Sequence, residues 1–422
     1  MSKNQTMYEL RLKRFEDAIA LKEPDTTPVA PWVDGLPYFL YPELGVTHKT
    51  ALYDHAKAME AHIRYHREFE PDANCTNSMF LCGKAADFLE PTMMDWPGRK
   101  GTPLPDESIY QMFEIEHMRA DEYDELIGDY SKFILTKYLP RAFKGLRGIE
   151  NFRIDPSVCI MNLPLTPIAA PDVQGALTKL IEYGRIQAQA DEVFLKFIGG
   201  MIDLGFPPIF AAYGESPFDV ISDYFRGTMG MLYDQVERPE KIKEACAFFA
   251  DIQIEKYVAM KDAPLPVRRV FFPLHKGMDG FISDEQYRDL YWAPFHRILA
   301  RLIDMGYTPI IYTEGSYETR CAFIREKLLE FPPGSCMIHF ESGDFAALKK
   351  MFQGIACIFG GVPMQMLEYA EKDKIVDRVK YLIDNCAAGG GYVLDASGAI
   401  EIAKRENIEA MFETARTYGK AR

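Results

Sequence analysis

The sequence lacks the loops that bind nucleotides and the cysteine pairs that bind metals or exchange disulfides. Neither GxGxxG nor GxxxxGK[ST] occurs, and no two of the eight cysteines form a CxxC. A Rossmann or P-loop domain is therefore not expected. Widely spaced single cysteines are typical of reduced thiols in a cytosolic protein, where most of them fill small sites in the core.

The chain also shows no targeting signal and no apolar run long enough to cross a bilayer. Residues 1–25 are charged throughout and lack the apolar centre of a signal peptide. Nowhere do ~18 apolar residues follow one another, which is about the minimum for a transmembrane helix. We expect a cytoplasmic protein with no membrane partner.

Positive charge is in deficit. The 422 residues carry a net charge of −14 at pH 7, and an acidic protein gains nothing from neutralising phosphates. Nucleic acid is therefore not expected as a partner. With 48% hydrophobic residues, the chain can bury a large core.

Short apolar runs separated by amphipathic stretches repeat along the chain from about residue 150. This alternation is the pattern of βα units and a parallel sheet, and seven or more units fit a closed barrel better than an open sheet. The predicted strands are 28–32, 207–212, 267–272, 308–312, 335–340, 356–359 and 391–394. The predicted helices between and after them are 172–200, 283–305, 317–330, 344–353, 371–386 and 405–418.

We therefore predict one domain, 1–422, with a TIM-type (β/α)8 barrel. The N-terminus is predicted to be a helical extension that ends at Glu23-Pro24-Asp25. Residues 50–70 have helical spacing, and the histidines of 48–66 are predicted to lie on the surface. Residues from about 75 to 110 are rich in Met, Pro, Asp and Gly and are interpreted as loops or short strands of an insertion.

In such barrels the functional groups lie where strands end at their carboxyl side. This rule converts the strand predictions into candidate site residues, which follow the predicted strands in order: Trp32 and Asp34, then Tyr213, Asp219, Asp223 and Arg226, then His275, then Tyr312 and Glu314, then His339 and Glu341. Six of them are predicted to contact the substrate: Trp32, Asp34, Tyr213, Asp219, Asp223 and Arg226. Asp219, Asp223 and Arg226 could instead be only the charged start of a helix.

Histidine together with carboxylates is a competent zinc set, so His275, Glu314, His339 and Glu341 are candidate metal ligands. A lone histidine at a strand end is more often a hydrogen-bonded structural residue than a ligand. Glu314 at the barrel mouth is the stronger candidate for a functional role of some kind, because burying a carboxylate there without a role is costly.

Several segments resemble the uroporphyrinogen decarboxylase superfamily. The resemblance is carried by LKEPDTTPVAPWVDG (21–35), ESPFDVISDYFRG (215–227), FISDEQYRDLYWAPF (281–295), GYTPII (306–311), GGVPMQML (360–367), LIDNCAAGGGYVLDASGAI (382–400) and ENIEAMFETARTYG (406–419). It implies a TIM-type barrel, often dimeric, so a homodimer is expected by analogy. Residues 75–160 match the family poorly and are interpreted as an insertion.

The superfamily contains cofactor-free decarboxylases and corrinoid-linked methyltransferases. The decarboxylases hold substrate carboxylates with arginines after the first strand, where this chain reads PWVDGLPYF and has none. The methyltransferases resemble this chain in the barrel and bind zinc through an HxC pair and a late cysteine. Here the HxCG position reads Tyr312-Thr313-Glu314-Gly315, and the late cysteine falls at Gly398. Zinc would therefore need another ligand set, or be absent.

The leading hypothesis from the resemblance is a methyltransferase component that moves a methyl group between a small methylated substrate and a corrinoid protein. Glu314 would polarise the substrate or ligate a metal, and His275 or Tyr312 would act as the acid. No cobalamin-binding DxHxxG occurs in the chain, so the corrinoid would lie on the partner. Demethylation of methyl ethers would suit an oxygen-rich zinc site.

Two alternatives remain. A cofactor-free decarboxylase (lyase) of a uroporphyrinogen-like or other carboxylate would need basic residues at the mouth, where only Arg226, Lys276 and Arg320 are candidates. A non-catalytic barrel that binds a corrinoid or a small ligand is the third reading.

Overall fold

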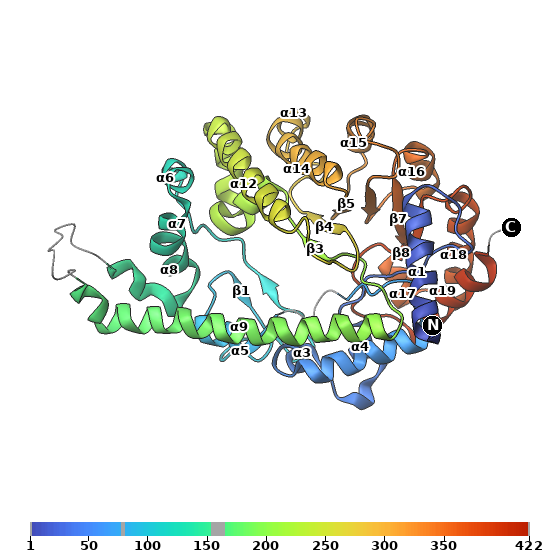
Figure 1. The fold of residues 1–422 in the computed structure, drawn as a ribbon, viewed down its shortest axis with the longest axis horizontal. Helices are drawn as coiled ribbons and strands as arrows, with labels where there is room; N and C mark the ends of the chain where they lie inside the picture. The colour runs from blue at the N-terminus through green and yellow to red at the C-terminus, as the bar shows by residue number, and fades with distance from the viewer. Residues whose placement is uncertain (1, 77–80, 153–164, 421–422) are drawn as a thin grey trace.

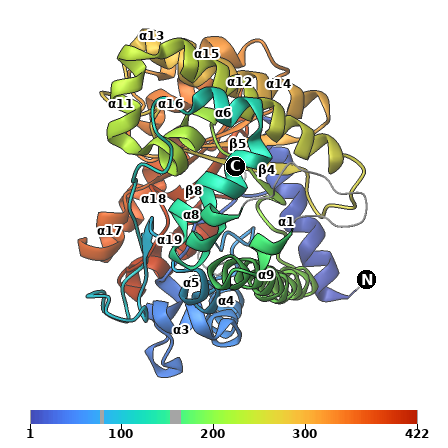
Figure 2. The same cartoon turned by 90° about the vertical axis from the view of Figure 1, so that its left-hand side faces the viewer.

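The computed structural model describes residues 2–76, 81–152 and 165–420. A parallel sheet in the order β3-β4-β5-β6-β7-β8 lies at its centre, and helices surround the strands (Figures 1 and 2). The strands are β3 (Ala212–Tyr213), β4 (Arg269–Leu274), β5 (Thr308–Thr313), β6 (Met337–Phe340), β7 (Cys357–Val362) and β8 (Tyr392–Ala396). Within the described ranges no helix is long and apolar enough to cross a membrane.

Two further segments, 28–33 and 74–76, join the edges of this sheet. Leu394 of β8 donates its backbone N–H to Pro28 (2.8 Å), and Val33 donates to Cys75 (3.2 Å). Asn74 then donates to Pro207 (2.8 Å), just before β3. The ring is therefore closed, and the predicted TIM-type barrel is confirmed. The closing segments pair only through isolated parallel bridges.

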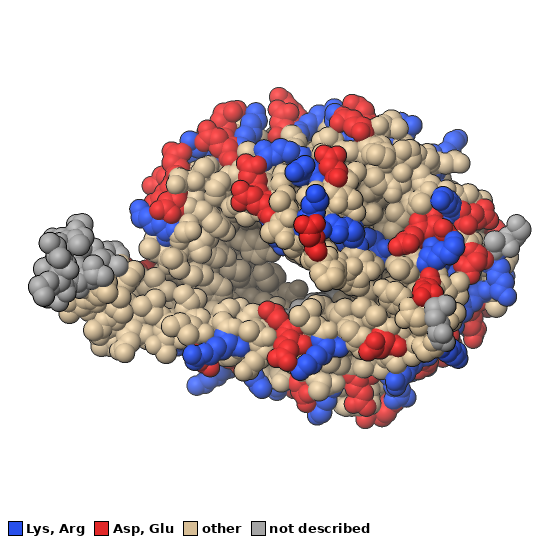
Figure 3. All heavy atoms as spheres, in the orientation of Figure 1, with Lys and Arg blue, Asp and Glu red and all other residues tan. Residues whose placement is uncertain are grey.

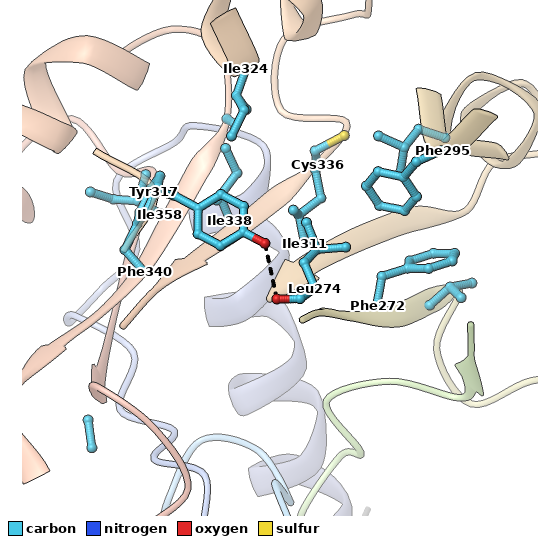
Figure 4. Packing of buried hydrophobic residues seen from close by; sticks show 14 of the residues in the cluster. Phe272, Leu274, Phe295, Ile311, Tyr317, Ile324, Cys336, Ile338, Phe340 and Ile358 are labelled. Atoms are coloured by element: carbon cyan, nitrogen blue, oxygen red, sulfur yellow. Dashed lines mark hydrogen bonds between the residues drawn. The ribbon is translucent and has the colours of Figure 1, made fainter. Parts of the chain in front are cut away.

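Apolar packing holds the barrel to its helices. Strands β4 to β7 are fully or almost fully buried, as expected for strands covered on both faces. Phe272, Ile311 and Ile338 point outward against helix residues such as Phe295 of α14 (Figure 4). The hydroxyl of Tyr317 donates to the carbonyl of Leu274 (3.1 Å), which fixes the loop after β5 beside the end of β4.

The helices of the barrel follow the predicted pattern with local breaks. They are α1 (Lys3–Ile19), α2 (Leu36–Leu40), α3 (His48–Tyr53), α4 (His55–Phe69), α10 (Pro217–Val220), α11 (Gly227–Glu237), α12 (Pro239–Ala259), α13 (Asp284–Gln286), α14 (Ala293–Asp304), α15 (Cys321–Leu328), α16 (Phe345–Phe352), α17 (Met364–Tyr369), α18 (Lys372–Cys386) and α19 (Arg405–Tyr418).

The segment predicted as one helix, 50–70, is two helices. The side chain of Asp54 accepts a hydrogen bond from the backbone N–H of Lys57 (3.3 Å) and so begins α4 as a cap. The surface prediction for the histidines is wrong for His62 and His66, which are buried. Both lie on the inner face of α4, where aromatic rings cover them.

The described part of the predicted insertion lies with helix α9 beside the mouth of the barrel, where α6 contacts α12 (Figure 1). It contains α5 (Gly83–Leu89), the strand pair β1 (Met94–Asp95) and β2 (Gln111–Met112), and α6 (Tyr123–Gly128), α7 (Tyr130–Phe133) and α8 (Leu139–Ala142), before α9 (Pro171–Asp203). Leu89, Leu146, Ile149 and Ala176 form a small separate core there. The remaining residues of the insertion, 77–80 and 153–160, lie outside the described part.

Candidate active site

A pocket of about 640 Å³ lies at the carboxyl ends of the barrel strands. The space-filling view shows the molecule hollowed between α9 and α12 (Figure 3), where Figure 1 places β1 and β3. Eight of the predicted site residues line the pocket: Trp32, Asp34, Tyr213, Asp223, His275, Tyr312, Glu314 and Glu341. Residues that are more than 300 positions apart in the sequence therefore lie together at the strand ends, as the strand-end rule predicts.

His275, directly after β4, is held by two carboxylates from one helical turn. Its Nδ1 lies 2.6 Å from Oδ2 of Asp223, and its backbone N–H donates to Oδ2 of Asp219 (3.0 Å). Burial would lower the pKa of His275, but the hydrogen bond to Asp223 and the charges of Asp219 and Glu314 outweigh it and raise the pKa to about 10. The imidazole is therefore protonated at neutral pH, with Nδ1–H donating to Asp223.

Asp219 lies behind the pocket and is fully buried. It accepts the backbone N–H groups of His275 and Lys276 (3.0 Å each) and the hydroxyl of Tyr291 (2.6 Å). Burial raises the pKa of Asp219 to about 7, although the charge of His275 opposes the rise. Asp219 was predicted as a substrate contact, but its position makes it a support for the loop that carries His275.

Glu314, after β5, lies beside His275 on the same wall of the pocket. Its Oε2 lies 3.7 Å from Nε2 of His275. The surrounding protein removes hydration from Glu314 and raises its pKa, and the charge of Glu341 adds to the rise while His275 opposes it. Glu341 accepts a hydrogen bond from the backbone N–H of Gly315. A proton donor and an acceptor of raised basicity thus share one pocket wall.

Aromatic rings form much of the pocket floor. Trp32 packs on Phe271 (ring centroids 4.7 Å apart) and meets Tyr312 edge-on at 5.6 Å. The hydroxyl of Tyr213 donates to Glu215 (3.0 Å), which leaves its partly exposed ring to the pocket. Tyr312 lies flat on His339, with the rings 4.0 Å apart and 6° from parallel.

The family model of uroporphyrinogen decarboxylase (URO-D) matches residues 208–418. The chain belongs to the uroporphyrinogen decarboxylase family. No curated protein matches it significantly in sequence. Among solved structures, a methyltransferase from Methanosarcina mazei is similar with a TM-score of 0.62, over 97% of this chain and 98% of its own, at 12% identity. That likeness supports the barrel fold.

Two basic residues considered for substrate binding in this uroporphyrinogen decarboxylase family member are occupied elsewhere. Arg226 is buried, with Nε 2.5 Å from Asp234 and Nη1 2.7 Å from Glu116, and it does not line the pocket. Arg320 pairs with Asp284 and donates to the carbonyl of Ile282 (2.6 Å). Both arginines therefore bind groups of the protein itself and are not free to bind a substrate.

The four predicted metal ligands do not converge on one point. His339 is buried under Tyr312, and its Nε2 lies 3.1 Å from the carbonyl of Ala396. In the described ranges no three His, Cys, Asp or Glu side chains are grouped to hold a metal. His275 and Glu314 offer two donors, whereas a catalytic zinc site has three protein ligands. The residues therefore do not fit the zinc site that the family resemblance implies.

The insertion supplies a wall of the pocket that the sequence did not indicate. Met94, Tyr110, Met112 and Glu114 line it, and Nζ of Lys276 binds Oε1 of Glu114 at 2.5 Å. The available sequence signal was the pair of alternating carboxylates, Glu114 and Glu116, which follow two apolar residues. In the structure these carboxylates form ion pairs with the buried Lys276 and Arg226.

Proposed function

We propose that this protein is an enzyme that moves a methyl group from a small methylated substrate to a separate corrinoid protein. The observation that carries the proposal is the arrangement Asp223–His275–Glu314 on the wall of an aromatic pocket at the mouth of the barrel. Membership of the uroporphyrinogen decarboxylase family supports an enzymatic role, because the family resemblance covers both lyases and methyltransferases.

His275 is the proton donor of the proposed reaction. Asp223 holds Nδ1–H, so that Nε2–H is directed to the side of Glu314 and the pocket. Nε2–H donates its proton to the atom that was methylated, as the methyl group leaves an oxygen or after it has left a nitrogen. A donor with a pKa of about 10 is matched to leaving groups of similar basicity, such as phenolates and amines.

Glu314 and Tyr312 complete the local chemistry. Glu314 stabilises the imidazolium before transfer, and its raised pKa lets it pass a proton back to His275 afterwards. Burial raises the pKa of Tyr312 far above its usual value, so its phenol stays neutral on the floor of the pocket. The corrinoid supplies a nucleophilic centre with an electron pair for the methyl carbon, and the loops at the mouth of the barrel are its docking surface.

A lyase acting on a polycarboxylate finds less support. Such a substrate needs cations at the mouth, yet no lysine or arginine is among the described residues that line the pocket. Lys276 is already paired with Glu114 and Asp223. The third reading, a barrel that only binds its ligand, does not explain the protonated His275 beside Glu314.

The test is methyl transfer to free cobalamin reduced to its cobalt(I) state. A panel of O-, N- and S-methylated compounds is supplied, and the absorbance change on methylation is followed together with the demethylated product. His275→Gln should slow transfer by about 100-fold or more, the usual size of a general-acid contribution. His296→Gln, on α14 and paired with Glu330 (3.1 Å), is the matched control and should behave as wild type. Release of CO2 from carboxylate substrates without any methyl transfer would refute the proposal.

A further inference from the structure

The pocket carries more negative than positive charge. Five carboxylates line it: Asp34, Glu114, Asp223, Glu314 and Glu341. The only basic side chain among the described lining residues is His275, and Lys276 lies behind it. His275 is matched by Asp223 at 2.6 Å, and Lys276 is matched by Glu114 at 2.5 Å. These two pairs cancel, so the excess charge comes from the other carboxylates.

Glu314 and Glu341 provide the part of this excess that faces the ligand. No lysine or arginine of the described chain forms an ion pair with either of them, and the imidazole of His275 is 3.7 Å from Glu314. Glu341 is stabilised by one backbone N–H, that of Gly315. Two neighbouring carboxylates in a partly dehydrated pocket repel each other, and a ligand of positive charge would relieve that repulsion.

The aromatic floor is a second and independent feature suited to the same ligand. Trp32, Tyr110, Tyr213, Tyr224, Phe271 and Tyr312 line the pocket. Aromatic faces attract onium groups, and cages of such rings are used to recognise quaternary ammonium ligands. An anionic or purely apolar ligand would use the rings but would leave Glu341 without a counter-charge and Glu314 with only the imidazole of His275, 3.7 Å away.

We propose that the methyl donor is a cation, a methylated ammonium or sulfonium compound whose onium group lies against the aromatic floor beside Glu314 and Glu341. This inference rests on the proposed methyltransferase function and names its substrate class. The pocket volume of about 640 Å³ exceeds that of a trimethylammonium group, which leaves space for a further substituent on the donor and for the approach of the acceptor.

The transfer balances without an oxidant or a reductant. The bond between nitrogen or sulfur and the methyl carbon breaks, and its electron pair stays on nitrogen or sulfur. The electron pair of the nucleophilic acceptor on the corrinoid protein forms the new bond to carbon. A quaternary ammonium leaves as a neutral tertiary amine, and a sulfonium leaves as a neutral thioether. His275 can then protonate the freed amine, which prevents it from taking the methyl group back.

Charge selectivity is tested with two ligands of equal shape. Choline has a quaternary nitrogen where 3,3-dimethylbutan-1-ol has a carbon, so titration calorimetry of both isolates the charge. Choline should bind at least about tenfold more tightly. The free energy of a desolvated cation–π contact beside a carboxylate exceeds the free energy of a tenfold change in affinity. Glu314→Gln and Glu341→Gln should each reduce that preference by about threefold or more, of the order of one partly screened charge. Glu318→Gln, an exposed neighbour outside the pocket lining, should leave it unchanged.

The outcomes separate this inference from the proposed function. Equal or tighter binding of the neutral alcohol overturns the cationic donor, even where a neutral methyl ether methylates cobalamin and the proposed function stands. Selective binding of choline that is lost in the two glutamine variants supports the inference about the pocket. If no methylated cation then gives up its methyl group to reduced cobalamin, the methyltransferase function fails, and with it the role of the cation as a donor.

Discussion

The protonation of His275 is the feature on which the proposed chemistry depends most, and the charge of Asp223 should control it. We expect Asp223→Asn to lower the pKa of His275 by about 2 units or more, because the amide oxygen can still accept the hydrogen bond while the charge is gone. Two unit charges about 4 Å apart interact by about 4 kcal/mol at an effective dielectric constant of about 20, which corresponds to about 3 pKa units. Nδ1 and Oδ2 are 2.6 Å apart, so the centres of the two delocalised charges are separated by about the distance used in this estimate.

The assay is a pH titration by NMR of protein labelled with ¹³C only in its histidines. The sequence has eight of them, and His275→Gln identifies the signal of interest. In the wild type that signal should remain in its protonated position at pH 8 and move only near pH 10. In Asp223→Asn it should move between about pH 7 and 8, since Asp219 and Glu314 still favour the charged form. Asp251→Asn, on the exposed side of α12, should leave it in place.

The same shift has a consequence for stability. A histidine whose pKa is about 10 in the folded state and about 6.5 in the unfolded chain stabilises the fold fully below pH 6.5, and this contribution disappears as pH rises towards 10. The difference of about 3.5 units corresponds to an upper value of about 5 kcal/mol. A wild-type His275 signal that titrates near pH 6.5 would refute both the predicted protonation and the acid role.

Three further outcomes are expected. Arg226→Ala should lower the free energy of unfolding by about 3 kcal/mol, because the buried Asp234 then loses its nearer cation and keeps only Arg238 at 3.4 Å. Arg185→Ala, at an exposed pair with Glu182, should cost less than about 1 kcal/mol in the same urea titration. His66, whose pKa burial lowers to about 4, should make the fold lose about 3 kcal/mol as pH falls from 6.5 to 4. His66→Gln should remove most of that loss, and an unchanged acid profile would contradict it. Metal analysis of protein purified without chelators should find well below one zinc per chain, and one zinc that is lost in Glu314→Ala would overturn our reading of the ligand geometry.

The barrel could be predicted from the sequence because its strands are buried on both faces. The runs at 267–272, 308–312 and 356–359 match β4, β5 and β7 to within about three residues, since a strand covered on both sides must be apolar throughout. The segment around Asn74 gave no such signal. It closes the ring through single backbone hydrogen bonds, and a three-residue polar pairing has no side-chain periodicity to detect.

The candidate site was predicted by topology and was incomplete for a physical reason. The strand-end rule finds groups that the barrel itself positions, such as His275 and Glu314. It cannot find Tyr110 or Glu114, because their place depends on how the insertion folds over the mouth. The rule also does not distinguish groups that face the pocket from groups directed behind it, which is why Asp219 and Arg226 were grouped with Asp223.

The turn that carries Asp219 and Asp223 explains how the pocket combines a fixed cation with an excess of negative charge. Asp219 accepts hydrogen bonds from the backbone N–H groups of His275 and Lys276. Asp223 accepts the Nδ1–H of His275 with one oxygen, and its other oxygen lies 3.3 Å from Nζ of Lys276. Both residues after β4 are thus fixed in backbone and side chain by carboxylates four positions apart, which lie on one helical face. Their charges are matched within the wall of the pocket and are not available to a ligand. The charge that a ligand meets is therefore set by Glu314 and Glu341 on the two following strands, and substitutions there should change substrate selectivity without releasing His275 from Asp223.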